Sequence, residues 1–468
     1  METILQQDHQ NIVRILDKVK QEALVFLNTL EQRPTSTQNR IHPDRILEEM
    51  GYGSEVALDE FLERLLPLIV AQAGPRYLGF VTGGATPAAI VGDWLTSIYD
   101  QNAQATNSQG GVSALIELET IHLLRQLLNL PNSFLGGFVT GATMANFTGL
   151  AVARQWFGKE LGKDFAKEGI TEKITVFSAN QHSSSVKCLA MLGIGSQNVI
   201  KIQTLEGDRE AIAIADLEKQ IQTLNGAPFV LISSAGTVNT ADFDDFVAIS
   251  KLKEKYRFWW HIDAAFGGFA AVSSQYKHLV SGWEHADSIT VDAHKWLNVP
   301  YESAFYLIKE ECQLLQIESF QNTNAPYLGN PLENFNYLNF LPENSRRLKA
   351  LPVWFSLVAY GKKGVQEWVE NSIKMAQLLT DFIANSSEFE LLAPTRLNNV
   401  CFTLKGNEKQ EKVSTFLETL NDTGSVFMTP TVLGNQKGIR ASFVNWRTTE
   451  KDIQFITDIM QEVASKLK

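Results

Sequence analysis

The feature that most constrains the fold of this chain is an alternation of short apolar runs with helix-length segments, beginning near residue 87. Each run is bounded by Gly, Ser, Ala or Asp, and a segment long enough for a helix separates it from the next. This alternation is typical of a mostly parallel β-sheet with helices on both faces. The five runs are Gly137-Phe138-Val139, Ile174 to Phe177, Phe229 to Ile232, Trp259 to Ile262 and Ser288 to Val291.

Helical patterns flank this central region on both sides. Apolar residues recur at helical spacing over residues 10–32, and residues 57–73 form a second expected helix. After residue 351, a helix over 353–383 precedes alternating strand runs and a final helix from Glu450. We therefore predict an N-terminal helical, dimer-forming segment (1–86), a large α/β domain (87–350) and a small C-terminal α+β domain (351–468).

Composition excludes several classes of function. The formal charge of −11 over 468 residues argues against nucleic acid and anionic membranes as partners. No apolar run reaches the roughly 18 residues of a membrane span, and the amino terminus lacks the pattern of a signal peptide. Three scattered cysteines indicate neither a disulfide framework nor a zinc site. We expect a cytoplasmic protein.

Two charged residues stand at strand ends, where sheets of this kind bind ligands. Lys295 lies in Asp292-Ala293-His294-Lys295-Trp296, whose apolar and aromatic character should desolvate the amine and lower its pKa, as a Schiff-base lysine requires. Asp263 ends an earlier run and is followed by Ala264 and Ala265, which leave room for a flat ring. An acid that pairs with a protonated pyridine nitrogen suits pyridoxal 5′-phosphate (PLP). Together the two residues predict a PLP site, although a lone lysine is usually a solvated surface residue.

Three weaker signals fall at the same edge of the expected sheet. The glycine-rich segment from Gly136 to Thr143 opens a helix, and backbone amides at such a start bind anions. His182 and Thr237 each follow a strand run, and His182 could stack on a planar cofactor. Each signal alone is as well explained by an ordinary turn or cap.

These motifs, in this order, resemble the PLP-dependent group II amino-acid decarboxylases of fold type I, which include aromatic-L-amino-acid and glutamate decarboxylases. The resemblance runs from about Gly74 to about Ile453 and is closest around His261 to Ala265, His294 to Trp296 and Ser345 to Trp354. Some positions depart from the family pattern. Asp292 stands where some relatives have Asn near the phosphate, and Ala241 replaces a common Gly.

The resemblance implies an L-amino-acid decarboxylase that acts as a homodimer, with its active site at the subunit boundary. Lys295 would form the Schiff base, Asp263 would hold the pyridine nitrogen, and His182 would stack on the ring. Thr82 would lie near the substrate carboxylate. Eight positions are implied to bind the cofactor: Ala142, Thr143, His182, Thr237, Asp263, Ala265, His294 and Lys295.

Relatives protonate the carbanion with a tyrosine on a mobile loop, and a gapless count from Ser345-Arg346-Arg347 places Tyr337 at that position. The alternative is that Tyr337 packs the loop, as Tyr327 or Phe340 could. Catalytic roles are thus expected for Lys295, His182 and Tyr337. Two other functions stay open. One is a different PLP reaction, either aldehyde synthesis by coupled oxidative deamination or transamination, and the other is a non-catalytic PLP-fold protein.

Overall fold

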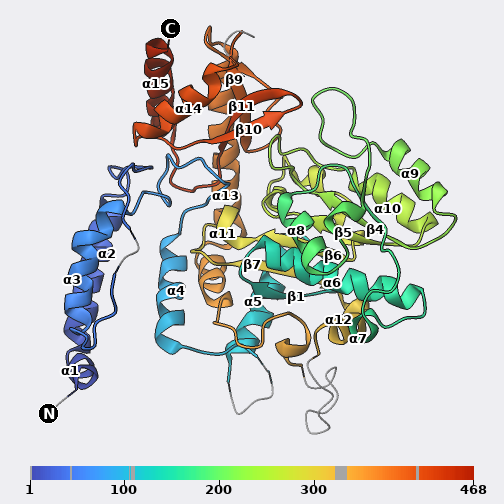
Figure 1. Ribbon diagram of the computed structural model, residues 1–468, viewed down its shortest axis with the longest axis horizontal. Helices are drawn as coiled ribbons and strands as arrows, with labels where there is room; N and C mark the ends of the chain where they lie inside the picture. Colours follow the sequence, from blue (N-terminus) through green and yellow to red (C-terminus); the bar gives the residue numbers. More distant parts are fainter. Residues whose placement is uncertain are drawn as a thin grey trace.

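A computed structural model describes residues 3–42, 45–104, 106, 111–321, 335–406 and 410–467. A large domain surrounds one seven-stranded sheet, and a small domain with a second sheet sits on top of it (Figure 1). The long helix α13 (Ala350–Ala384) runs from the large domain into the small one. It contains one non-helical residue, Gly361, with φ of 59°, which glycine adopts without steric cost.

The large sheet has the strand order β1-β7-β6-β5-β4-β2-β3. Strands β3, β2, β4, β5 and β6 are parallel, whereas β7 runs antiparallel to both β6 and β1. Four of the five expected runs lie wholly on strands of this sheet, and the fifth overlaps β2, which begins two residues later than expected, at Val176. The mostly parallel α/β prediction is thus confirmed. The strands are β1 (Phe134–Val139), β2 (Val176–Ser178), β3 (Val199–Lys201), β4 (Phe229–Ser234), β5 (Phe258–Asp263), β6 (Ser288–Asp292) and β7 (Ala304–Lys309).

Two of these strands, β3 and β7, are additions to the predicted set. Strand β3 is three residues long and partly exposed, so its apolar signal is weak. Strand β7 follows β6 after only the short helix α11 (Ala293–Trp296), so no helix-length segment announces it. Without a crossover helix, the chain can return only in the antiparallel direction.

Helices cover both faces of the sheet. Strands such as β4, β5 and β6 are therefore buried along their whole length. One face packs against α5, α9, α10 and α13, and the other against α6, α8 and α12. These helices are α5 (Ser113–Leu127), α6 (Ala142–Glu160), α8 (Ser183–Met191), α9 (Ile214–Thr223), α10 (Phe246–Lys255) and α12 (Gln313–Phe320), and the short helix α7 (Phe165–Glu168) lies between α6 and β2 in the chain.

The small domain holds an antiparallel sheet of order β10-β11-β9-β8, which packs against the second half of α13 and two further helices. Its apolar core is separate from the two cores of the large domain. The elements are β8 (Phe389–Leu391), β9 (Asn399–Leu404), β10 (Thr429–Leu433), β11 (Gln436–Ser442), α14 (Lys412–Asp422) and α15 (Glu450–Lys466).

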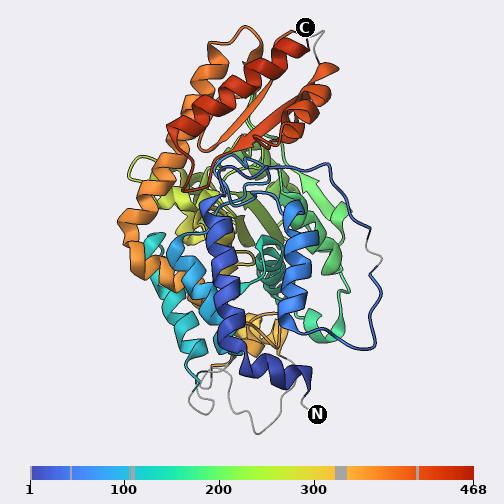
Figure 2. The same cartoon turned by 90° about the vertical axis from the view of Figure 1, so that its left-hand side faces the viewer.

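The first helices stand apart from the rest of the molecule. In Figures 1 and 2, α2 (Ile12–Asn28) and α3 (Ser54–Arg64) lie side by side at the flank of the body, with α1 (Ile4–Gln10) at their end and α4 (Pro87–Tyr99) behind them. They are shorter than the expected helices over 10–32 and 57–73. Val13, Leu16 and Val25 of α2 are exposed, and so are Trp94 and Ile98 of α4. Among the described residues, no helix is long and apolar enough to cross a membrane.

Candidate active site

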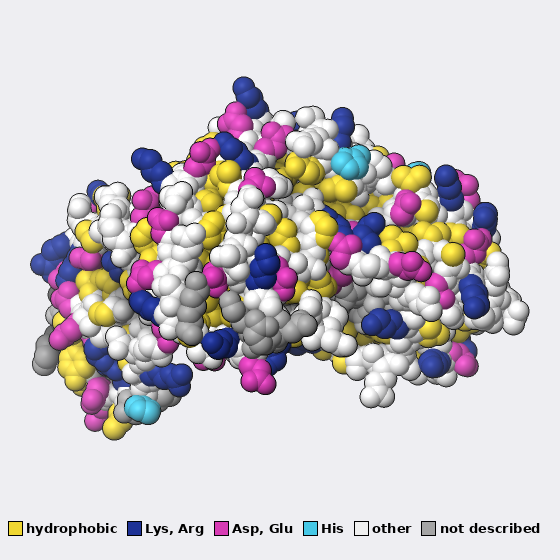
Figure 3. Space-filling view, turned by 90° about the horizontal axis from the view of Figure 1, so that it is seen from above, with side chains coloured by type: hydrophobic (Ala, Val, Ile, Leu, Met, Phe, Trp, Pro, Cys, Tyr) yellow, Lys and Arg dark blue, Asp and Glu magenta, His cyan; other side chains and the backbone are white. Residues whose placement is uncertain are grey.

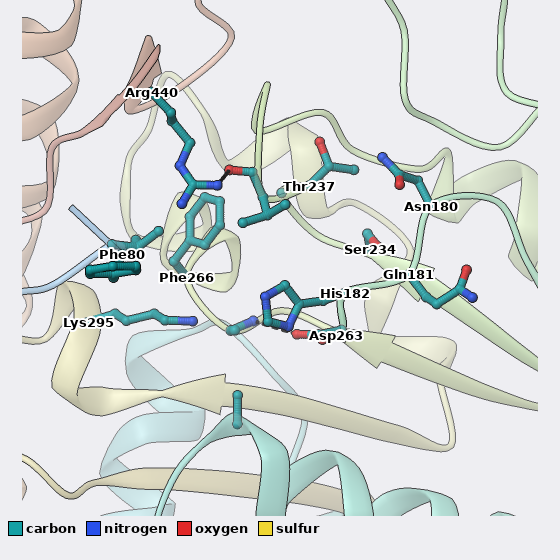
Figure 4. Close-up of a pocket in the computed structure, with 15 residues that line it drawn as sticks. Phe80, Asn180, Gln181, His182, Ser234, Thr237, Asp263, Phe266, Lys295 and Arg440 are labelled. Atoms are coloured by element: carbon teal, nitrogen blue, oxygen red, sulfur yellow. Dashed lines mark hydrogen bonds between the residues drawn. The ribbon is translucent and has the colours of Figure 1, made fainter. Parts of the chain in front are cut away.

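A cavity of about 290 Å³ opens at the carboxyl ends of the parallel strands, where the strand-end residues were expected to meet. Figure 4 shows Lys295, Asp263 and His182 close together along one side of it, with Arg440 and Thr237 on the other. Lys295, His182 and Thr237 follow β6, β2 and β4. Asp263 is the last residue of β5 and Arg440 lies within β11, so the two sheets together build the site. The remaining lining residues are Phe80, Val81, Ala142, Asn180, Gln181, Ser234, Gly236, Val238, Ala265 and Phe266.

Lys295 is held by Asp292, one helical turn before it. Its Nζ atom lies 2.8 Å from Asp292 Oδ2, and the Asp292 side chain is almost fully buried. Burial by itself would lower the pKa of Lys295, but attraction to Asp292, with Asp263 and Tyr301, outweighs it, and the pKa is raised. The expected fall in the pKa of Lys295 is therefore wrong in this structure, because the surroundings contain a buried carboxylate as well as aromatic rings.

Asp263 is fixed by a chain of buried hydrogen bonds that sequence reasoning missed. Its Oδ2 atom accepts from Asn146 Nδ2 at 3.0 Å, and Oδ1 accepts from the amide of Ala265 at 3.2 Å. Asn146 Oδ1 in turn lies 2.8 Å from His261 Nε2, and His261 Nδ1 lies 2.8 Å from Ser288 Oγ. Since Asn146 donates to the carboxylate, its oxygen must accept from His261, so Nε2 carries the imidazole proton.

Burial keeps this imidazole neutral, because it lowers the pKa of His261 to about 4. All hydrogen bonds of the network are therefore donated in one direction, from Ser288 to His261, from His261 to Asn146 and from Asn146 to the Asp263 carboxylate. Asn146 lies on α6 and His261 on β5, so only the packing of that helix on the sheet brings them together.

His182 caps helix α8 from the edge of the cavity. Its Nδ1 atom accepts from the amide of Ser184 at 3.2 Å and lies 2.7 Å from Ser184 Oγ. Burial lowers the pKa of His182, with Lys295 and Arg440 adding to the effect and Asp263 opposing it. The cap fixes the backbone of His182 at the start of α8. Because Nδ1 serves this cap, Nε2 is the ring nitrogen that remains for a partner in the cavity.

The expected anion site lies at the start of α6, but a carboxylate already binds there. The amide of Ala142 donates to Asp292 Oδ1 at 2.6 Å, and His294 Nε2 lies 3.6 Å from the same oxygen. Thr143 follows on the first turn of α6 and does not line the cavity. Gly136 and Gly137 lie inside β1, where an added Cβ would collide with Tyr306, so these two glycines serve strand packing and not the anion site.

Three further predicted positions, Thr237, Ala265 and Thr82, lie in or next to the cavity. Thr237 and Ala265 line the cavity. Thr82 is buried beside it, in a segment that packs on the lysine backbone, since a Cβ on Gly83 would meet Lys295 O at 2.0 Å. Phe80 and Val81, just before Thr82, line the cavity with φ of 56° each, a left-handed conformation that is unfavourable for side chains of this size.

Tyr337 is the predicted catalytic residue that the structure does not bring to the cavity. It is fully buried, its Oη atom donates to Gly136 O at 3.3 Å, and its ring stacks 4.4 Å from the Arg346 guanidinium carbon. Burial raises the pKa of Tyr337 well above its ordinary value. Its catalytic role stays a prediction that this placement does not support. Tyr327 and the Asn- and Pro-rich stretch around Asn330 lie outside the described residues.

Arg440 could not be assigned to the site from sequence, because it comes from the small domain. It is buried, Nη1 donates to Val238 O at 3.0 Å, and Nε has no hydrogen-bond partner among the described residues. Among the described residues that line the cavity, Arg440 is the one cationic side chain besides Lys295. No group of His, Cys, Asp and Glu in the described part of the chain could hold a metal ion.

The residues present fit PLP. Lys295 offers an amine for its aldehyde, Asp263 offers a buried carboxylate for its ring nitrogen, and the His182 ring lies between them in Figure 4. The start of α6 offers amides for its phosphate, with the reservation that Asp292 adds a negative charge there.

Comparison with known proteins identifies the family. Residues 53–405 match the model of the pyridoxal-dependent decarboxylase conserved domain. An aromatic-L-amino-acid decarboxylase of Bacillus atrophaeus is 29% identical over 411 residues, covering 84% of this chain and 80% of the relative. A phenylacetaldehyde synthase of Arabidopsis thaliana is 26% identical, covering 94% and 93%.

The fold agrees with this assignment. The crystal structure of Oryza sativa TDC with PLP and tryptamine superposes with a TM-score of 0.89 at 21% identity, covering 98% of both chains. The chain is thus a PLP-dependent carboxy-lyase of fold type I, and the non-catalytic alternative is set aside. It belongs to the pyridoxal-dependent decarboxylase family, as an amino-acid decarboxylase.

Proposed function

We propose that this enzyme converts an aromatic L-amino acid to CO₂ and the corresponding primary amine, with Lys295 as the residue that holds PLP. The observation that carries the proposal is the convergence of Lys295, Asp263 and His182 on one cavity. Phe80, Val81 and Phe266 give this cavity apolar walls, which suit an aromatic side chain. The aromatic-amino-acid decarboxylase among the relatives supports the same substrate class.

Bound PLP would act as an electron sink for the substrate Cα atom, and the chain decides which bond is broken. Asp263, oriented by Asn146 and the Ala265 amide, would hold the proton on the ring nitrogen. His182 would cover the ring, and its Nε2 atom could hold or pass a proton above it. Ala142, Thr143 and His294 are proposed to lie near the phosphate, and Thr237 and Ala265 would flank the ring.

The substrate carboxylate is proposed to lie between Thr82 and Arg440. Arg440 supplies the charge that attracts it, and its unpartnered Nε atom leaves a donor free. A carboxylate held away from water in such a pocket is lost more readily as CO₂. If the arginine instead binds a side-chain carboxylate, acidic amino acids would be the substrates.

The test is a screen of CO₂ release by the PLP-loaded enzyme across the twenty amino acids. Release from tyrosine, tryptophan or phenylalanine supports the proposal, and release only from aspartate or glutamate replaces the substrate class. No release from any of them would refute decarboxylation itself.

A second activity is favoured by one relative, the phenylacetaldehyde synthase. An aldehyde synthase consumes O₂ and yields aldehyde and ammonia, whereas a decarboxylase yields amine. Measuring amine, aldehyde and O₂ uptake on the same sample separates the two.

We also propose a homodimer in the cytoplasm. The exposed apolar side chains of α2 and α4 form the kind of surface that marks a subunit interface. All three cysteines are free and buried, as a reducing compartment allows. On the face shown in Figure 3, acidic and basic side chains are interspersed, without the basic patch of a nucleic-acid partner. Analytical ultracentrifugation of the wild type and of Leu16→Glu would test the dimer, which the variant should weaken.

A further inference from the structure

Asn146 is fully buried on α6, and both protons of its side-chain amide are used. One is donated to Asp263 Oδ2, and the other is donated to Ser184 Oγ, which lies 3.2 Å from Asn146 Nδ2. Ser184 is buried in the first turn of α8, the helix that His182 caps. One side chain of α6 thus connects the carboxylate at the end of β5 with the start of α8.

The direction of these hydrogen bonds is set in the core, where the indole of Trp259 can only donate. Its Nε1 atom donates to Ser288 Oγ at 2.9 Å, so the Ser288 hydroxyl keeps its own proton for His261 Nδ1. His261 then carries its proton on Nε2 and donates it to Asn146 Oδ1. Because the oxygen of Asn146 is occupied on this side, its nitrogen is left to donate toward α8.

His182 receives the last hydrogen bonds of this network. Ser184 Oγ accepts from Asn146, so its own proton is free for His182 Nδ1, 2.7 Å away. The backbone amide of Ser184 donates to the same Nδ1 atom at 3.2 Å. A ring nitrogen that accepts carries no proton, so a neutral His182 has its proton on Nε2. Figure 4 shows this ring in the cavity, between Lys295 and Asp263.

We propose that Asn146 and Ser184 are positioning residues that fix the proton of His182 on Nε2, so that this histidine meets the cavity contents as a hydrogen-bond donor. The amide of Ser184 alone gives one donor at the long end of the usual range. Its hydroxyl is nearer, but it could accept from a protonated Nδ1 if Asn146 did not donate to it. The inference rests on the proposed function in one respect, namely that PLP and its substrate occupy the cavity.

Four charged groups around His182 act on its protonation together with this network. Partial burial lowers the pKa of His182, Asp263 on β5 and Asp292 on β6 raise it, and Lys295 on α11 and Arg440 on β11 lower it. Substitutions of the two positioning residues retain all four charges. A shift in the protonation midpoint of His182 therefore reports on its hydrogen bonds and not on a lost charge.

The experiment measures the His182 ring by nitrogen NMR of ring-labelled histidine, in the PLP-loaded enzyme without substrate. His182→Gln identifies the signals. In the wild type, the form protonated on Nε2 should exceed the form protonated on Nδ1 by about tenfold. Ser184→Ala removes a donor to Nδ1 and so stabilises the neutral ring less, and the protonation midpoint of His182 should rise by about half a pH unit.

Two further variants control this comparison. Ser184→Thr keeps a hydroxyl at the same place and should retain the wild-type midpoint. Ser185→Ala is the matched control, because Ser185 is an equally buried neighbour whose hydroxyl lies 3.5 Å from Asp263 Oδ2. It should leave the midpoint of His182 unchanged, and a shift as large as that of Ser184→Ala would contradict the inference.

A double-mutant cycle tests whether Asn146 acts through Ser184. Asn146→Ala frees the Ser184 hydroxyl to accept from Nδ1, so the midpoint of His182 should rise by about one pH unit. In the Ser184→Ala background, the same substitution should add less than about 0.3 pH unit. If Asn146→Ala fails to fold, the two Ser184 variants decide the inference.

A wild-type His182 protonated on Nδ1, an unchanged midpoint in Ser184→Ala, or full additivity in the cycle would overturn the inference. Failure of the proposed function shows differently, as a wild type that binds PLP but releases no CO₂, whatever the state of the His182 ring.

Discussion

Two clusters of buried charged and aromatic side chains, one around Lys295 and one around Tyr337, differ in their surroundings, and the cavity described above lies at the first of them. Around Lys295, side chains from the ends of four strands of the large sheet and from β11 of the small sheet line a space of about 290 Å³. Around Tyr337, the ring is enclosed by Gly136, Phe335 and the Glu117–Arg346 ion pair, in which Arg346 Nη1 donates to Glu117 Oε1 at 2.8 Å. Charged and aromatic side chains thus line a cavity at the strand ends around Lys295, whereas around Tyr337 the same residue types pack against the middle of a strand and stabilise the core.

The strongest way to break this comparison is to remove the amine of the first cluster. Lys295→Ala should lower kcat by a factor on the order of 10³ or more, because no other lysine in the described part of the chain lines the cavity. CO₂ release and the cofactor absorbance band should be lost together. Retained turnover would show that the first cluster is not the active site.

The second cluster should respond in the opposite way, through stability. Arg346→Met leaves the Glu117 carboxylate buried without its partner, which should lower the free energy of unfolding by about 3–5 kcal/mol. Arg347→Met is the matched control, since its pair with Asp93 is half exposed and should be worth less than about 1 kcal/mol. Urea unfolding of both variants measures the difference, and equal losses would contradict the assignment.

Asp292 offers a smaller and more specific test inside the first cluster. Its carboxylate accepts a hydrogen bond from the Ala142 amide at the start of α6, and its negative charge would repel the phosphate of PLP there. Asp292→Asn should therefore bind PLP about tenfold more tightly, measured by equilibrium titration of the absorbance. Weaker binding would mean instead that the contact with Lys295 matters more than the repulsion.

Tyr337→Phe should have the smallest effect. It removes one hydrogen bond to Gly136 O, worth about 1 kcal/mol of stability, and should leave amine as the product. Tyr327→Phe is the informative partner, because Tyr327 is the other tyrosine between Phe320 and Ser345. A switch from amine to aldehyde in Tyr337→Phe would restore its predicted catalytic role and require the loop to leave the position described here.

The sequence by itself determined the mostly parallel sheet and the edge at which its chemistry would lie. Apolar runs of strand length and the residues that end them are local signals, and parallel strands place their carboxyl ends together. Lys295, Asp263, His182 and Thr237 could therefore be predicted to meet without any coordinates. Strand β7 could not be predicted, because it runs antiparallel to β6 and no helix-length segment precedes it in the sequence.

Only the tertiary structure decided which side chains surround these four. Asn146 reaches Asp263 from a helix, Arg440 enters from the small domain, and Glu210 reaches Thr237 from a loop. It also decided that Tyr337 is core and that Asp292 raises the pKa of Lys295 where aromatic neighbours alone would lower it. The reason is physical: burial, hydrogen-bond direction and charge pairing depend on distances between residues far apart in the chain, which no local pattern encodes.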